Sequence, residues 1–275
     1  MEQKGLDSFK KLIKKWEALS VNIQDKPVGA PIILPDIFMI SKSGTGRTHL
    51  LRLLGEYLAS RENLMDFYGD VKFFEFMLNY CPPREPFTEI QRLMSEISDA
   101  AGFRSEYRGI IYIDVDEWRD HFEEKHFASF LEYIADNSDD WLVVFSVTDN
   151  DSEKNARIEA FLSAYLRLER VTIEPPTVDE LMKYLEELLM AYGISVDESA
   201  KKLLSESVER LCHNKYYDGY KTIKMLGKDI AYSIYAERSN PGKPLSAAEL
   251  TEFSKDSEYL NRTVTKIEKI RKIGF

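Results

Sequence analysis

The sequence has few cysteines, no long apolar run and no metal-binding pattern, and each absence excludes a class of protein. Two cysteines, Cys81 and Cys212, in 275 residues cannot form a disulfide framework or a four-cysteine metal site. The four histidines lack the spacing of metal ligands. No apolar stretch approaches the roughly 20 residues that a membrane helix needs, and the first residues lack the apolar core of a signal peptide. We therefore expect a cytoplasmic protein without a membrane partner.

The charge balance argues against a general electrostatic attraction to nucleic acid. The chain carries 47 acidic and 37 basic side chains, which gives a formal net charge of -10. A DNA- or RNA-binding domain usually carries a basic patch or stripe instead. With 44% hydrophobic residues, the chain can bury a sizeable core in one large domain, or in a medium and a small one. Nucleic acid is therefore not an expected partner.

Apolar strands and amphipathic helices alternate along the first part of the chain. Each predicted strand is a short, nearly continuous apolar run, and each predicted helix has apolar residues at helical spacing. The predicted strands cover residues 31–41, 71–78, 108–118, 141–151 and 170–176. The predicted helices cover residues 6–18, 48–61, 88–101, 127–136 and 155–168. This order predicts an α/β fold with a five-stranded parallel sheet, right-handed crossovers and helices on both faces.

From residue 177 onward the pattern changes to helices alone. Helical patterns cover residues 177–193, 195–212 and 220–238, and a last helical segment follows the turn-forming residues 239–246. Thr177 and Glu180 have the spacing of a capping box, and the Pro175–Pro176 pair separates the two parts. We predict an α/β domain over residues 1–176, which includes the N-terminal helix. A helical lid domain with a C-terminal helical extension is predicted over residues 177–275.

One turn between a strand and a helix has the pattern of a phosphate-binding loop (P-loop). The stretch FMISKSGTGRTHLLRLL runs from an apolar strand through a glycine-rich turn into a helix. Such a turn directs backbone N–H groups and the positive end of the helix dipole at a bound anion. It departs twice from the G-x-x-x-x-G-K-[ST] pattern, because Ser41 replaces the first glycine and Arg47 replaces the lysine. The residues expected to bind nucleotide here are Ser43, Gly44, Thr45, Gly46, Arg47, Thr48 and His49.

Four of these residues have specific expected roles. Gly44 and Gly46 permit the positive φ angles that the tight loop requires. Thr48 has the position at which a hydroxyl binds Mg²⁺. Arg47 keeps the positive charge of the lysine, but its planar, bulkier guanidinium should fit poorly in the narrow position that a lysine fills. The loop therefore predicts ATP or ADP as ligand, together with Mg²⁺.

An acidic residue at the end of another strand completes the predicted site. Asp114 follows the apolar run IIYI, where a carboxylate would hold the metal through water. In hydrolysing P-loop proteins the next residue is usually a glutamate that polarises the attacking water, and here it is Val115. Strand alternation would place Asp116 on the face of Asp114, and Glu117 on the face of Val115. Asp114 is thus the predicted metal ligand beside Thr48, and Glu117 is a displaced candidate base. A register with Asp116 and Glu117 as the active pair is the alternative.

In the order and spacing of these motifs, the chain resembles a AAA+ ATPase. The resemblance is nearest to the branch that contains the red-type Rubisco activase and the stage V sporulation ATPases, and it covers residues 5–237. The leading GLDSFKKLIKKWEAL resembles the first helix of that branch. The segments YGDVKFFE, RGIIYID, WLVVFSV, TIEPPTVDEL and YDGYKTIKML then follow in the order of that branch. The resemblance implies a P-loop domain followed by a helical lid, with nucleotide held between subunits of an oligomer.

The resemblance also implies roles for residues outside the loop. Thr148, or alternatively Asn150, lies at the end of the fourth strand, where the family has a sensor of the γ-phosphate. Arg167, or alternatively Arg170, comes shortly before the fifth strand. There the family has an arginine that reaches the nucleotide of a neighbouring subunit, so that Arg167 joins Glu117 as a candidate catalytic residue.

Several charged or catalytic positions depart from the family pattern. The sensor arginine of the lid is Thr222 here, so that only the neighbouring Lys221 can supply a charge; the loop lysine is Arg47, and the glutamate is Val115. Removing such electrostatic groups costs transition-state stabilisation. The sequence therefore favours a nucleotide-binding protein with weak or no hydrolysis. It is expected to act with a protein partner in an oligomer, either of its own or with an active AAA+ paralogue.

Three other functions are compatible with the same residues. The first is an active ATP-driven remodeller of a protein partner. The second is a AAA+-like scaffold that binds no nucleotide. The third is a replication-loader type of AAA+ protein, against which the acidic charge balance argues.

Overall fold

The computed structural model describes most of the chain. The described residues are 6–23, 34–61, 64, 72–80, 86–101, 109–137, 141–214, 217–237 and 243–256. The beginning of the first predicted strand (31–33), Cys81 and the predicted C-terminal extension beyond residue 256 lie outside them. In the described part of the chain, no helix combines the length and the apolar character that crossing a membrane requires.

The chain divides into two compact units. One comprises residues 4–42 and 47–174, and the other comprises residues 175–275 together with Ser43–Gly46. The first unit contains the sheet and the helices that cover it, and the second contains the helices that follow the sheet in sequence.

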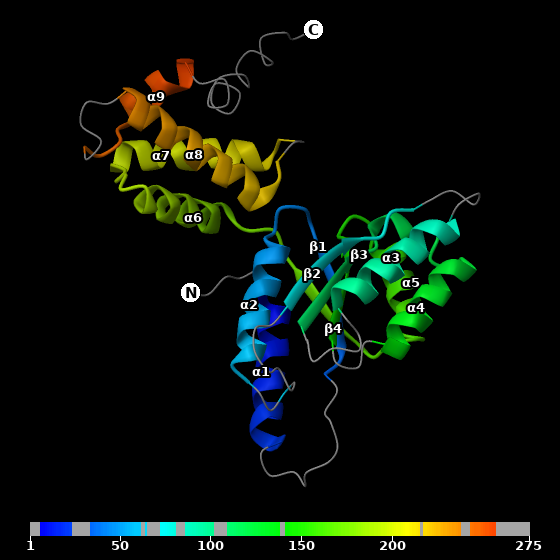
Figure 1. Ribbon diagram of the computed structural model, residues 1–275. Helices are drawn as coiled ribbons and strands as arrows, with labels where there is room; N and C mark the ends of the chain where they lie inside the picture. Colours follow the sequence, from blue (N-terminus) through cyan, green and yellow to red (C-terminus); the bar gives the residue numbers. More distant parts are fainter. Residues whose placement is uncertain are drawn as a thin grey trace. The chain divides into compact units, whose positions relative to one another are not determined.

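The first unit is built on a sheet of five parallel strands (Figure 1). The strands are β1 (Asp36–Ser41), β2 (Lys72–Met77), β3 (Gly109–Asp114), β4 (Trp141–Thr148) and β5 (Leu168–Ile173). Their order is β2-β3-β4-β1-β5. In open sheets of this kind, ligands bind at the edge where the carboxyl ends of the strands meet. The predicted α/β fold with a five-stranded parallel sheet is confirmed.

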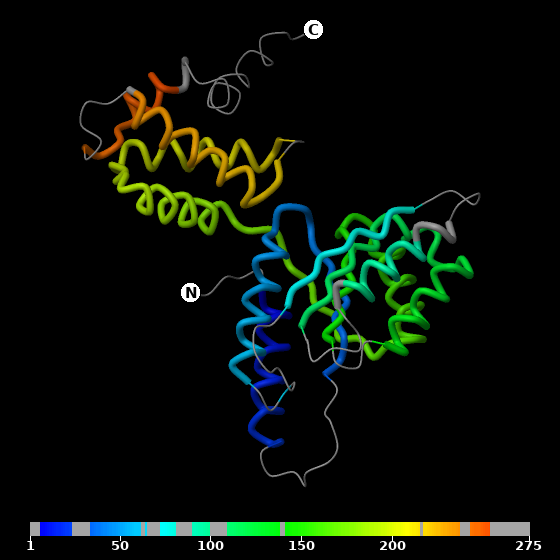
Figure 2. The backbone as a smooth tube through the Cα atoms, in the orientation of Figure 1, coloured from blue at the N-terminus to red at the C-terminus, as the bar shows by residue number. Residues whose placement is uncertain are grey.

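Helices cover both faces of this sheet, which agrees with its continuously apolar strands. The helices of the unit are α1 (Asp7–Ile23), α2 (Arg47–Ala59), α3 (Pro86–Ala101), α4 (Lys125–Asn137) and α5 (Ser152–Leu162), with the short 3-10 helix η2 (Asp116–Trp118). Helices α1 and α2 pack on one face, and α3, α4 and α5 pack on the other. Figure 2 traces this alternation of strand and helix from blue to green. In β1, Phe38 and Ile40 face the second group of helices, whereas Ile37 and Met39 face the first.

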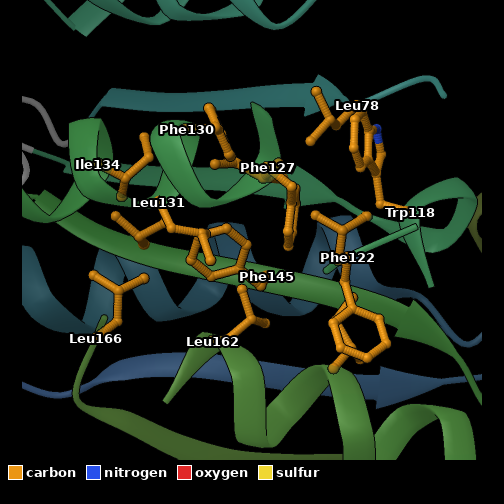
Figure 3. Close-up of a cluster of buried hydrophobic side chains, with 14 of the residues drawn as sticks. Leu78, Trp118, Phe122, Phe127, Phe130, Leu131, Ile134, Phe145, Leu162 and Leu166 are labelled. Carbon is orange, nitrogen blue, oxygen red and sulfur yellow. The ribbon is translucent and has the colours of Figure 1, made fainter. Parts of the chain in front are cut away.

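The larger core of this unit lies between the sheet and α3, α4 and α5. Figure 3 shows part of it, in which Trp118, Phe127 and Phe145 are fully buried among leucine and isoleucine side chains. The rings of Trp118 and Phe127 stack with their centroids 5.3 Å apart. Because Trp118 ends η2, this core also fixes the turn that follows β3, where the predicted catalytic carboxylates lie.

In its described residues, the second unit consists of helices. They are α6 (Val178–Ala191), α7 (Glu198–Cys212), α8 (Gly219–Glu237) and α9 (Ala247–Asp256), and all four contribute to one apolar core. The predicted capping box is present at the start of α6, where the Thr177 side chain accepts the N–H of Glu180 and the Glu180 side chain accepts the N–H of Thr177. Gly193 follows α6 with a φ of 71°. A glycine in this conformation is a common helix stop, as the sequence predicts.

One boundary predicted from the sequence is wrong by several residues. The helix predicted over residues 155–168 ends at Leu162, and β5 begins at Leu168. Leu168 pairs with Asp36 at the start of β1, and the pairing continues to the end of both strands. Pairing with a buried strand therefore overrides the local helical pattern, a tertiary effect that periodicity alone does not report.

Asp36, at the start of β1, should make the stability of the protein depend on pH. Burial raises the pKa of its carboxyl to about 7, although Oδ1 accepts a hydrogen bond from the Val143 N–H at 2.9 Å. In the unfolded chain the same group has a pKa of about 4. Between these two values the unfolded chain has released a proton that the folded protein keeps. The free energy of unfolding therefore decreases as pH rises through this window.

The variant Asp36→Asn is uncharged, and its amide oxygen can keep the bond to Val143. We expect it to be more stable than the wild type by about 1–3 kcal/mol at pH 8, with a clearly smaller difference near pH 4.5, where the folded protein keeps the proton. Thermal melts at both pH values measure this. Asp136→Asn, on the exposed end of α4, is the matched control. Equal shifts of the melting temperature at both pH values would contradict the raised pKa.

Candidate nucleotide-binding site

The loop after β1 has the backbone conformation that the sequence predicts. Gly44 and Gly46 have φ angles of 72° and 85°, in the region that other residues rarely adopt. Among the described residues, none other than glycine has a positive φ, so Ser41 fits its place at the end of β1. Helix α2 begins directly behind the loop at Arg47. The first N–H groups of a helix have no partner within it, and they favour a bound anion.

The Arg47 side chain joins a polar cluster at the carboxyl ends of β3 and β4. Its Nη1 donates a hydrogen bond to Ser146 Oγ at 3.1 Å and lies 3.5 Å from Asp114 Oδ2. Ser146 Oγ is also 2.6 Å from the Tyr112 hydroxyl. Burial raises the pKa of Asp114, and the Asp116 N–H and the charge of Arg47 oppose this shift. Burial also raises the pKa of Tyr112 to about 12, so that its hydroxyl stays protonated. The groups of this cluster therefore satisfy one another.

Thr48 and His49 follow Arg47 on α2. The Thr48 hydroxyl donates to Glu75 Oε1 over 3.4 Å, a long hydrogen bond. Glu75 lies in β2, the neighbour of β3, and sequence reasoning missed it. A charged residue within the apolar strand KFFEFM was the available signal. His49 is exposed on α2, next to the loop in sequence.

Glu117, the candidate base, lies in a turn and not on an extended strand. The expected alternation of Asp116 and Glu117 between two faces is wrong, because β3 ends at Asp114 and Val115 leads into η2 with φ -114° and ψ 20°. The Glu117 carboxylate accepts a hydrogen bond from the Tyr80 N–H at 2.8 Å. Val115 is completely buried in the core. The Glu117 carboxylate is thus hydrogen-bonded to the segment that follows β2.

Both candidates for the sensor position belong to one hydrogen-bond network after β4. Asp116 Oδ1 accepts the Thr148 N–H at 2.6 Å, and the Thr148 hydroxyl bonds to the same carboxylate. Arg119 lies 3.2 Å from Asp116, donates to Thr148 O at 3.0 Å, and also bonds to Asn150. Sequence reasoning missed Arg119, although its i,i+3 spacing from Asp116 was a signal. Asp116 therefore connects the turn after β3 with the end of β4, whereas Asp114 pairs with Arg47.

The two candidate arginine fingers lie away from the carboxyl end of β1 within their unit. The backbone carbonyl of Arg167 accepts the Asp36 N–H at 2.9 Å, at the amino end of β1. Since β1 has six residues, about 20 Å of strand separates that end from the start of the loop. Arg170 pairs with Phe38 in mid-strand, and its side chain lies 3.1 Å from Glu159 on α5. In its own chain, Arg167 is therefore at the opposite edge of the sheet from the loop.

Lys221 and Thr222 lie in the first turn of α8, in the second unit. Lys221 Nζ is 3.5 Å from Asp218 Oδ2, and its side chain is largely exposed. Thr222 Oγ1 accepts the Asp218 N–H at 2.8 Å. Thr222 has the position at which the family that this chain resembles has a charged sensor. Here its side chain accepts a backbone hydrogen bond at the start of α8.

The predicted metal ligands do not fit a resident Mg²⁺ as they are arranged. Mg²⁺ prefers octahedral coordination by oxygen, usually from water, phosphate and one or two carboxylates. Asp114 is paired with the Arg47 guanidinium, and the Thr48 hydroxyl is bonded to Glu75. Across the part of the chain that the structure describes, no three His, Cys, Asp or Glu side chains group in a way that could hold a metal ion. A divalent ion at Asp114 would have to displace the guanidinium.

Comparison with known proteins gives matches among solved structures alone. Models of known protein families give no match, and neither do curated proteins. The structure of PCH-2 from C. elegans matches 92% of this chain at 14% identity, with a TM-score of 0.53. This chain covers 66% of PCH-2, just under two thirds of its length.

Two other solved structures match less well in shape. The AAA domain of FIGL-1, solved in complex with ADP, has a TM-score of 0.47 at 15% identity, over 92% of this chain and 82% of that one. Domain III of the Thermotoga maritima replication initiation protein DnaA has a TM-score of 0.48 at 17% identity, over 92% of both chains. At such low identities the matches concern the fold alone. Together with the order of its strands, the match to PCH-2 shows that this chain has the fold of a AAA+ P-loop NTPase.

Proposed function

We propose that the chain binds ATP or ADP at the loop between β1 and α2, and that it hydrolyses ATP weakly or not at all. The observation that carries the binding proposal is the loop itself. Two glycines with positive φ lead into a helix start, and a guanidinium and a hydroxyl follow at Arg47 and Thr48. Backbone N–H groups, the helix dipole and a fixed positive charge together favour a polyphosphate.

The residues after Asp114 support the proposal of weak hydrolysis. An attacking water needs a carboxylate that accepts its proton or orients it. Val115 offers no such group and is buried in the core. Glu117 accepts the Tyr80 N–H and precedes Trp118, the residue of η2 that packs in the core. The alternative, an active ATP-driven remodeller, requires this bond to open and Glu117 to reach the γ-phosphate.

The proposed partners are proteins, in an oligomer of this chain or with an active AAA+ paralogue in the cytoplasm. Arg167 fits this proposal, because it lies beside the amino end of β1, whereas the loop follows the carboxyl end of that strand. In such an oligomer Lys221 is the remaining charge for the lid sensor. The scaffold without nucleotide and the replication-loader type of protein stay as alternatives.

A paired measurement tests this proposal. A fluorescent ATP or ADP analogue is titrated into the protein, and phosphate release from ATP is assayed on the same sample, with and without Mg²⁺. We expect saturable binding, with phosphate release at background. Running both conditions also tests the sequence-based prediction that Mg²⁺ accompanies the nucleotide at Thr48 and Asp114. Saturable binding is expected to be lost in Gly46→Val, because a β-branched residue cannot easily adopt the φ of 85°.

Two outcomes would overturn parts of the proposal. Turnover that disappears in Glu117→Gln would establish an active ATPase, as the remodeller requires, since that variant keeps the size of the side chain and loses the carboxylate. If neither nucleotide binds, the scaffold without nucleotide is the alternative that remains. Phosphate release that is unchanged in Glu117→Gln and in Gly46→Val would instead indicate a contaminating ATPase.

A further inference from the structure

The Arg47–Asp114 pair occupies the place at which sequence reasoning puts a metal ion. Arg47 is the first residue of α2, and its guanidinium is in contact with Asp114 at the end of β3. Both side chains are mostly buried, with 18% and 17% of their surface exposed. In such surroundings a carboxylate needs a compensating charge. Here Arg47 supplies that charge.

The neighbouring groups fix the guanidinium in this position. Nη1 of Arg47 donates to Ser146 Oγ, and Ser146 in turn is bonded to the Tyr112 hydroxyl. Ser146 and Tyr112 lie on β4 and β3, in the middle of the sheet, so the chain of bonds is anchored in rigid structure. A lysine at position 47 has a single nitrogen, so it could not contact the carboxylate and the hydroxyl and also offer a second nitrogen to a ligand.

We propose that Arg47 replaces the divalent cation at this site, so that the chain binds free nucleotide, without Mg²⁺. This inference rests on the proposed function. A guanidinium has five N–H donors on three nitrogens, and both contacts described above involve Nη1 alone. The remaining part of the fork suits phosphate oxygens, which accept bidentate hydrogen bonds from arginine.

Two consequences distinguish this site from one that uses Mg²⁺. First, Asp114 is already neutralised, so binding gains little from a cation beside it. Second, a Mg²⁺ ion that arrives with the nucleotide meets the positive charge of Arg47 where it would seek a carboxylate, and like charges repel. The preferred ligand is therefore a metal-free nucleoside di- or triphosphate.

The experiment compares nucleotide affinity in excess Mg²⁺ and in excess EDTA, for the wild type and for Arg47→Lys. A fluorescent ADP analogue and a fluorescent ATP analogue serve as probes. For the wild type, we expect the two Kd values to agree within about threefold, with any difference in favour of EDTA. For Arg47→Lys, whose side chain ends one bond short of Arg47 Nη1 and so weakens the contact with Asp114, we expect Mg²⁺ to lower the Kd by about tenfold or more. Arg92→Lys, the same change on the exposed face of α3, should behave as the wild type.

The outcomes separate this inference from the proposed function. Wild-type binding that strengthens about tenfold with Mg²⁺ overturns the inference and leaves nucleotide binding established. If the Kd is independent of Mg²⁺ in both the wild type and Arg47→Lys, Arg47 is not what replaces the cation, and the inference is also overturned. Absence of wild-type binding in either buffer defeats the proposed function itself. If Arg47→Lys keeps its melting temperature but binds no nucleotide, the inference is judged on the wild-type Kd values in Mg²⁺ and in EDTA.

Discussion

Val115→Glu is expected to destabilise the protein by about 3 kcal/mol or more and not to restore ATP hydrolysis. The resemblance to hydrolysing P-loop proteins suggests this substitution, since a glutamate usually follows the metal-side aspartate there. In this chain the position is unsuited to a carboxylate. Val115 is fully buried in the core that includes Trp118 and Phe127, and its N–H donates to Ser146 O at 3.0 Å. A glutamate here would be charged and without a partner, or would have to turn the chain outward.

Urea denaturation and phosphate release, measured on the same variant, test this expectation. Val21→Glu is the matched control, because Val21 lies on α1 with 66% of its surface exposed. The control should unfold within about 0.5 kcal/mol of the wild type. A Val115→Glu protein of wild-type stability that hydrolyses ATP would contradict the prediction. It would show that position 115 can face the nucleotide and that the chain is one substitution away from an active enzyme.

The α/β fold could be predicted because its signals are local. Each strand is a short apolar run, and each helix has its own periodicity, so the alternation of the two fixes a parallel sheet with helices on both faces. The capping box at Thr177 and the stop at Gly193 are signals within a few residues, and both are present. The end of α5 was misplaced because Leu168 joins β5 through pairing with β1, a contact over 132 residues of sequence (168 minus 36).

The candidate site was predictable in its backbone and less so in its side chains. The positive φ angles of Gly44 and Gly46 follow from the glycine pattern. The partners of Arg47 do not, because Ser146 and Asp114 reach it from two other strands. Which of several polar residues at neighbouring strand ends will pair depends on strand order and side-chain direction. Neither the strand order nor the side-chain direction can be predicted from one segment of the sequence.

The turn after β3 shows the same limit in another form. The sequence-based prediction continued the strand beyond Asp114 and placed Asp116 and Glu117 on opposite faces of the sheet. In the structure the chain leaves the strand at Val115. Two groups favour the turn. The Asp116 N–H bonds to the Asp114 carboxylate at 3.0 Å, and Trp118 enters the core. Asp and Asn side chains favour such turns by bonding to the backbone two residues on. The D-x-D spacing was therefore the local signal, although its meaning depends on where the tryptophan packs.

Trp118→Ala should reduce the free energy of unfolding by about 3–5 kcal/mol, the range for removal of a large buried aromatic side chain. Trp118 has no exposed surface, stacks on Phe127, and meets the edge of the Tyr80 ring with the centroids 5.3 Å apart. Its indole N–H donates to Asn79 O at 3.2 Å. The indole thus joins the turn after β3, the segment after β2 and helix α4. Urea denaturation of the variant measures the loss, and a change below about 1 kcal/mol would contradict this account of the core.

Trp118→Phe separates packing from the hydrogen bond and connects the core with the site. A phenyl ring keeps the stack on Phe127 but leaves Asn79 O without its donor, so we expect a smaller loss of about 1–2 kcal/mol. Tyr80, next to Asn79, donates its N–H to Glu117. Loosening of this segment should therefore also release the Glu117 carboxylate. If the carboxylate is inactive because it is held there, phosphate release should rise in Trp118→Phe and fall again in the double variant with Glu117→Gln. If release stays at background in both, distance from the nucleotide, and not the bond to Tyr80, keeps Glu117 inactive.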